Sequence, residues 1–132
     1  MLKSAVKNDV KVSIVNPMTM NFPYSGPFGN GVIKVSEAVL KNMKTVWPQK
    51  SQKELYGMLG VTPMLGVNDM KENVFKPAHA KQLVDWAKKK GVGFLSYWSF
   101  YRDKACPGKN VNPSCSSIAQ NEKEFSKIFS KF

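Results

Sequence analysis

Three long apolar segments mark the chain, and each is followed by residues whose apolar positions recur at helical spacing. The first segment, residues 10–15, runs on through residue 20. A stretch rich in glycine and proline, residues 23–31, comes next and is typical of a loop. Apolar residues three or four positions apart then predict an amphipathic helix over about 35–47, which Pro48 ends.

The same order of strand and helix repeats for the second apolar segment. A run of mostly apolar residues near 56–67 predicts a strand, with Asn68 and Asp69 at its end. The next helix is predicted over Pro77–Lys90, because its initial proline suits a first turn and Gly91 suits the position that ends a helix.

The third apolar segment, residues 92–98, again predicts a strand, and a last amphipathic helix is expected at about 121–130. Strands that alternate with helices indicate an α/β fold with a parallel sheet. Strands that are almost continuously apolar indicate a sheet covered on both faces. A closed (β/α)8 TIM barrel needs eight such units and about 250 residues, so three units predict an incomplete barrel.

Aromatic and charged residues follow the third strand directly. Trp98 ends the strand, and Arg102 and Asp103 come shortly after it. In α/β barrels the residues just beyond the strand ends form the functional site. An aromatic ring beside a carboxylate suits a sugar, because the ring packs on the apolar face of a pyranose and the carboxylate holds its hydroxyls.

The net charge of +11 raises nucleic acid or an anionic surface as a partner. The lysines are spread along the predicted helix faces and no nucleic-acid-binding motif is present, so we expect neither nucleic acid nor membrane as the partner. No run of residues is long and apolar enough for a membrane span. Residues 1–9 lack the apolar core of a signal peptide and are expected to be unstructured or a linker. The chain therefore either stays inside the cell or does not begin at the natural start of the protein.

Two cysteines, Cys106 and Cys115, enclose a loop rich in turn-forming residues. The spacing allows a disulfide in an exported protein. A zinc site is not expected, because there is no Cys-x-x-Cys pair and the single histidine, His79, is interpreted as a solvated surface side chain. Neither a metal nor a cofactor is predicted.

Three motifs in order resemble the end of a known catalytic barrel. They are Met-Thr-Met at residues 18–20, Gly-Val-Thr-Pro-Met-Leu-Gly-Val-Asn-Asp at 60–69, and Leu-Ser-Tyr-Trp-Ser-Phe-Tyr-Arg-Asp at 95–103. This pattern resembles strands six to eight of glycoside hydrolase family 18, the chitinases. The resemblance implies that residues 1–132 form a partial domain of that family. It further implies chitin or chitooligosaccharide as the partner, possibly together with the missing N-terminal half of the barrel, and the extracellular location of the parent family.

The resemblance also implies individual roles. Trp98 matches the tryptophan that floors the sugar pocket, and Asp69 matches an aspartate that faces the substrate. The alternatives are a core tryptophan for Trp98 and a turn residue for Asp69. Arg102 matches the end of the eighth strand, where an ion pair with Asp103 competes with sugar contact. The remaining predicted contacts are Met18, Met20, Met64, Asn21 and Phe22, of which the methionines would otherwise be core filler.

The family's acid lies in a D-x-x-D-x-D-x-E motif, and no stretch of this chain matches it. The family uses the N-acetyl group of its own substrate as nucleophile. Its sixth strand usually reads Met-Thr-Met-Asp-Tyr, whereas this chain has Asn21 and Phe22, which lack the negative charge and the hydroxyl that holds the N-acetyl group. Catalytic residues are therefore expected to be absent. The sequence predicts a C-terminal piece of a chitinase-like hydrolase that is inactive alone, or alternatively a non-catalytic chitin-binding protein.

Overall fold

Three extended segments run parallel and side by side, in the same order as in the sequence. The computed structural model describes all of residues 1–132. Strand β1 (Gly60–Val61) pairs in parallel with β4 (Phe94–Leu95), and a bridge between Met64 and Trp98 extends this pairing. Parallel bridges from Val15 to Leu59 and from Met18 to Thr62 attach the first segment, which carries no named strand of its own.

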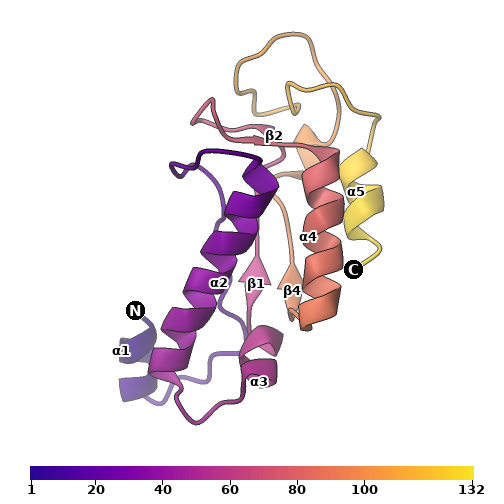
Figure 1. Ribbon diagram of the computed structural model, residues 1–132. Coiled ribbons are helices and arrows are strands. Elements are labelled where there is room, and N and C mark those ends of the chain that lie inside the picture. The colour runs from indigo at the N-terminus through magenta and orange to yellow at the C-terminus, as the bar shows by residue number, and fades with distance from the viewer.

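Backbone hydrogen bonds hold the three segments together over a longer stretch than the short strands suggest. The amide of Gly60 donates to the carbonyl of Val15 at 2.8 Å, and the amide of Thr19 donates to Thr62 at 2.9 Å. On the other side, the amide of Ser96 donates to Val61 at 3.0 Å. Two prolines at 17 and 63 lie within these segments and lack an amide donor, which is consistent with a ladder broken into short pieces. The result is a mixed α/β structure with no closed barrel, which confirms the predicted parallel arrangement (Figure 1).

Helices pack on only one face of this sheet. Figure 1 shows α2 (Phe28–Val46) and α4 (Pro77–Lys90) running alongside β1 and β4, with α5 (Glu124–Phe129) next to α4. Their buried side chains form one hydrophobic core with Leu59 and Val61 of the sheet. The other face leaves large apolar side chains exposed, so the prediction of a sheet covered on both faces is wrong. These exposed side chains are Ile14, Met18, Phe94 and Trp98.

Helix α2 begins seven residues earlier than the predicted start at residue 35, inside the expected glycine-rich loop. Two of the glycines there serve close packing instead of a turn. An added Cβ on Gly29 would lie 2.7 Å from the side-chain oxygen of Gln82, and one on Gly31 would lie 2.8 Å from the ring of Tyr24. The contact of Gly29 is with a helix far along the chain, so local composition misidentified residues 28–31 as part of a loop.

Helix α4 confirms its predicted bounds of Pro77 and Lys90, and Gly91 ends it in the left-handed conformation with φ of +72°. His79 is not the freely solvated residue that was expected. Its Nδ1 accepts the backbone amide of Lys76 at 3.2 Å, at the start of the helix. Burial, and secondarily the charge of Lys76, lowers the pKa of His79.

The second apolar segment does not form one continuous strand. Residues Gln52–Gly57 form helix α3, which opens with a capping box between Ser51 and Glu54. After β1 the chain turns at Gly66, whose φ is +71°, and β2 (Gly66–Val67) pairs antiparallel with β3 (Val74–Phe75). Periodicity alone could not show where an apolar run leaves the parallel sheet.

The ends of the chain are helical. Residues Leu2–Lys7 form α1, so the prediction that residues 1–9 are unstructured is wrong there; Leu2 packs against the core cluster and explains the difference. At the other end, α5 is shorter than the predicted 121–130. No helix in the structure combines the length and apolar character needed to cross a bilayer.

Gly66→Ala is expected to destabilise the fold by about 3 kcal/mol, because the residue has a positive φ and an added Cβ would overlap the carbonyl oxygen of Ser116. The measurement is the free energy of unfolding in urea. Gly57→Ala is the matched control, since a Cβ at Gly57 meets no atom within 4 Å. Equal unfolding free energies for the two variants would contradict the tight approach at Gly66.

Candidate functional site

A pocket of about 370 Å³ lies where the three parallel segments end. Each segment contributes to its wall, as expected if the carboxyl ends of parallel strands meet at one edge. Of the eight predicted sugar contacts, seven line it: Met18, Met20, Asn21, Met64, Asp69, Trp98 and Arg102. The structure adds Val111 and Pro113, which no motif or periodicity in the sequence marked as pocket residues.

Trp98 presents an exposed ring from a firmly held backbone. Its side chain is 57% exposed, which excludes the alternative of a core tryptophan in this chain. Its amide donates to the carbonyl of Pro63 at 2.8 Å, and its carbonyl accepts the amide of Leu65 at 2.7 Å. The ring is therefore available to a ligand while the chain beneath it is fixed on the neighbouring strand.

The pocket methionines differ in exposure. Met18 is 73% exposed, whereas Met64 is only 5% exposed and packs as a core residue would. Met20 is intermediate. The pocket therefore has an exposed apolar wall on the side of the first segment, while Met64 lies opposite Trp98 in the parallel bridge.

Asn21 and Asp69 meet at the pocket rim, although 48 residues separate them. The Nδ2 of Asn21 donates to Oδ2 of Asp69 at 2.6 Å, and its Oδ1 accepts the amide of Met70 at 3.2 Å. Asn21 adopts a left-handed conformation with φ of +55°, which asparagine tolerates better than most residues. Asp69 is the only carboxylate that lines the pocket.

Phe22 does not line the pocket, contrary to the prediction. The left-handed turn at Asn21 sends the next side chain toward the core, where the Phe22 ring lies 5.0 Å from that of Phe28 and 6.4 Å from that of Tyr24. Its amide donates to Oδ1 of Asn73 at 3.0 Å. The substitution that was interpreted as a missing hydroxyl at the site is thus a packing residue here.

Arg102 is fully buried and binds backbone carbonyls. Its Nη2 donates to Leu65 at 2.8 Å and to Val67 at 2.6 Å, its Nε donates to Leu65 at 3.1 Å, and its Nη1 donates to Asn112. Burial lowers the pKa of Arg102, while the nearby charge of Asp69 acts in the opposite direction. Arg102 therefore connects the backbone near β2 to the disulfide loop and supports the pocket wall that they form.

The ion pair between Arg102 and Asp103, which was the alternative to sugar contact, does not form. Instead, the Asp103 carboxylate accepts the amides of Phe125 and Ser126 at 3.0 and 2.7 Å, where α5 begins, together with the Ser126 hydroxyl and the Gln120 amide. Successive side chains in the turn η1 (Phe100–Arg102) and just after it point to different partners, so adjacency in sequence misled the expectation.

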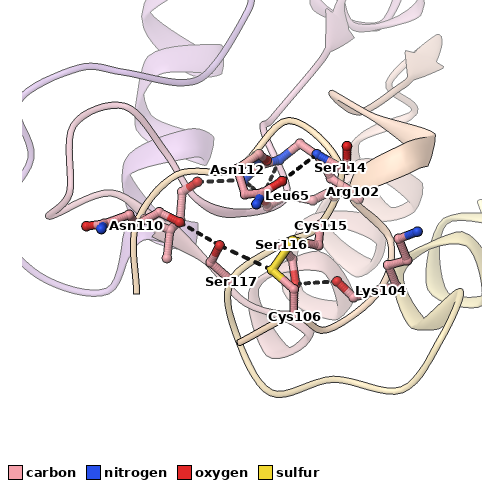
Figure 2. The surroundings of a disulfide bond; sticks show 11 residues. Leu65, Arg102, Lys104, Cys106, Asn110, Asn112, Ser114, Cys115, Ser116 and Ser117 are labelled. Atoms are coloured by element: carbon pink, nitrogen blue, oxygen red, sulfur yellow. Dashed lines mark hydrogen bonds between the residues drawn. A yellow bond between two sulfur atoms is a disulfide. The ribbon is translucent and has the colours of Figure 1, made fainter. Parts of the chain in front are cut away.

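The disulfide Cys106–Cys115 forms as the sequence allowed, with Cα atoms 5.7 Å apart. Figure 2 shows the loop it closes, in which the Asn112 carbonyl turns toward Arg102 and Ser117 donates to the carbonyl of Asn110 at 2.6 Å. The loop lies with the β2–β3 hairpin at the top of Figure 1, joined to it by the Val67 amide, which donates to Ser116 at 2.9 Å. This arrangement brings Val111 and Pro113 to the pocket.

The pocket combines a mostly apolar lining with a few polar groups. Five of the nine lining residues are hydrophobic, and the polar groups are one amide, one carboxylate and the buried guanidinium. No group of three or more potential metal ligands comes together in the chain. The pocket can pack an apolar ring face against Trp98 and accept hydroxyl donors at Asp69.

Comparison with known proteins identifies the fold. No family model matches the sequence. A probable bifunctional chitinase/lysozyme of Escherichia coli is 29% identical over 99% of this chain, and endochitinase 11 of Metarhizium anisopliae is 30% identical over 77% of it. The catalytic domain of a hyperthermophilic chitinase from Pyrococcus furiosus superposes with a TM-score of 0.92 at 40% identity over 98% of this chain. The chain is homologous to part of a family 18-type chitinase catalytic domain.

The chitinase relationship covers nearly all of this chain and a minor part of its relatives. The aligned region is 16% of the Escherichia coli protein, 22% of the Metarhizium protein and 43% of the Pyrococcus chain. A catalytic-site mutant of the Pyrococcus chitinase domain has also been solved with chito-oligosaccharides, and it superposes equally well. The family resemblance inferred from the three strand-end motifs is confirmed.

Arg102→Lys is expected to destabilise this chitinase-type domain by about 3 kcal/mol, because an ammonium cannot reach the carbonyls of Leu65, Val67 and Asn112 together and buried acceptors would lose their donors. Urea unfolding measures the change. Lys109→Met, an exposed change in the same disulfide loop, is the control. A loss no greater than that of the control would contradict the structural role of the guanidinium.

Proposed function

We propose that this chain is the sugar-binding part of a chitinase-like (β/α)8 barrel, with its three extended segments as strands six to eight. Its pocket binds N-acetylglucosamine units of β-1,4-linked chitin. The observation that carries this proposal is the exposed ring of Trp98 beside Asp69 at the carboxyl ends of parallel segments. The solved complex of a homologous chitinase domain with chito-oligosaccharides supports it.

The size and composition of the pocket fit one sugar ring. Ligand sites are commonly about 300–1,000 Å³ and mostly apolar with a few placed polar groups. At about 370 Å³ this pocket is at the small end of that range. Its lining includes Met18 and Trp98, which are exposed on the sheet face that the helices leave uncovered, and a neighbouring sugar of the same polymer would continue along this face.

Hydrolysis requires an acid that this chain does not supply. The single pocket carboxylate, Asp69, is hydrogen-bonded to Asn21, and the sequence contains no D-x-x-D-x-D-x-E motif. We infer that the acid comes from a polypeptide equivalent to the N-terminal half of the barrel. The exposed apolar face at Ile14, Met18 and Phe94 is the surface that such a partner would cover.

The alternative function is a chitin-binding protein without catalysis. It is favoured by Asn21, which replaces an acidic residue of the family motif, and by Phe22, which packs into the core. Incubation of the chain with a fluorogenic chitooligosaccharide is expected to give no turnover. Robust turnover by the chain alone would refute the inference that it lacks the acid.

Trp98→Ala is expected to weaken retention on chitin beads at least about tenfold, or about 1.4 kcal/mol, because the sugar loses its stacking surface. Tyr101→Ala is the matched control: its ring is 77% exposed but does not line the pocket. Equal retention of both variants, or failure of the folded wild-type chain to bind, would count against the proposed function.

A further inference from the structure

The amide of Asn21 connects two distant parts of the pocket rim. It stands at the end of the first extended segment, whereas Asp69 and Met70 belong to the turn between β2 and β3. Both ends of the amide are engaged, one donating to the carboxylate at 2.6 Å and the other accepting a backbone amide at 3.2 Å. The side chain therefore fixes the position of the hairpin relative to the first segment.

This double contact requires asparagine at position 21. Aspartate has the same length and is the residue usual in the family motif, but it has only acceptor oxygens when ionised. An aspartate here would place a second carboxylate within hydrogen-bond distance of Asp69, and like charges so close oppose ionisation of both. Asn21 lacks the negative charge of the aspartate usual at this position, but its amide donates a hydrogen bond to the Asp69 carboxylate.

We propose that Asn21 is a positioning residue that locks the Asp69 carboxylate at the pocket rim and leaves Asp69 Oδ1 to accept a sugar hydroxyl. The role of Asp69 as acceptor of a sugar hydroxyl rests on the proposed function. The fixing of its carboxylate by Asn21, here called the lock, does not depend on that function. Oδ2 of Asp69 is used by Asn21, and Oδ1 has no hydrogen-bond partner within the chain. A carboxylate held by one oxygen keeps a fixed direction for the other, which lowers the ordering cost of binding.

The lock is tested first without ligand, in the variant Asn21→Asp. Two adjacent carboxyl groups raise the pKa of the pair in the folded variant above its unfolded value. A raised folded pKa gives stability that is present at low pH and lost as pH rises, so the urea midpoint of the variant should fall progressively below that of wild type between about pH 4 and pH 7. The other ionisable groups near Asp69 are Arg102 in the pocket and Lys71 and Glu72 on the hairpin, and they are the same in both proteins.

Two further variants make this test specific. Asn42→Asp adds the same charge at an exposed position of α2, and its deficit relative to wild type should change little with pH. The double variant Asn21→Asp/Asp69→Asn exchanges amide and carboxylate, restores one donor and one acceptor, and should remove the pH-dependent deficit. If the urea midpoint of Asn21→Asp lies below that of wild type by an amount independent of pH, the proposal that Asn21 fixes Asp69 is overturned. It is also overturned if the exchanged double variant keeps the pH-dependent loss of stability.

Calorimetric titration with tri-N-acetylchitotriose at pH 7 then tests the sugar contact. The exchanged variant is expected to bind at least about tenfold more weakly than wild type, since its carboxylate has moved to position 21 although its stability is restored. Wild-type affinity in the exchanged variant would overturn the role of Asp69 as acceptor. Absence of binding by the wild-type chain would overturn the proposed function and the sugar contact, whereas the pH-dependent stability decides the lock separately.

Discussion

One buried guanidinium organises the end of this molecule that carries the pocket. Of its 20 cationic side chains, only Arg102 is an arginine, and it is the only one fully buried. The carbonyls of Leu65 and Val67 lie where the second segment has left the parallel sheet, and Asn112 lies in the disulfide loop. A planar fork of donors can satisfy several carbonyls at once, which a lysine cannot do. The hairpin and the loop are therefore fixed by the same side chain.

Residues 98–103 contribute both to the pocket and to the packing that supports it. Trp98 supplies the exposed ring, Arg102 secures the wall behind the pocket, and Asp103 binds the amides at the start of α5. A short stretch that begins on the sheet thus reaches the pocket, the hairpin and the C-terminal helix. Because Arg102 and Asp103 each have several hydrogen-bond partners, the ring of Trp98 can stay exposed without loosening the backbone that carries it.

The one-sided sheet explains how this domain relates to its chitinase homologues. Its helices bury one face, while the opposite face exposes Ile14, Met18, Phe94 and Trp98. Parallel sheets are ordinarily covered on both faces. The Pyrococcus chitinase chain that superposes on this one is more than twice as long, since the match covers 43% of it. Two of the side chains exposed on this face, Met18 and Trp98, also line the pocket.

The sequence by itself determined the order and parallel arrangement of the three extended segments, the bounds of α4 and the place of Trp98 beyond its strand. These follow from local signals: apolar periodicity, a proline and a glycine at the helix ends, and the rule that parallel strands bring their carboxyl ends together. The position of Trp98 at the pocket could be predicted for this reason, whereas Met18 and Asp69 were assigned to it by the resemblance to the chitinase motifs.

Only the tertiary structure decided how the polar groups pair and where the chain departs from regularity. Asn21 meets Asp69 across 48 residues, and Arg102 binds carbonyls and not the adjacent Asp103. The inward turn of Phe22 and the close packing at Gly29 likewise depend on distant neighbours. A donor and an acceptor far apart in the sequence carry no local pattern, because their meeting depends on every turn of the backbone between them.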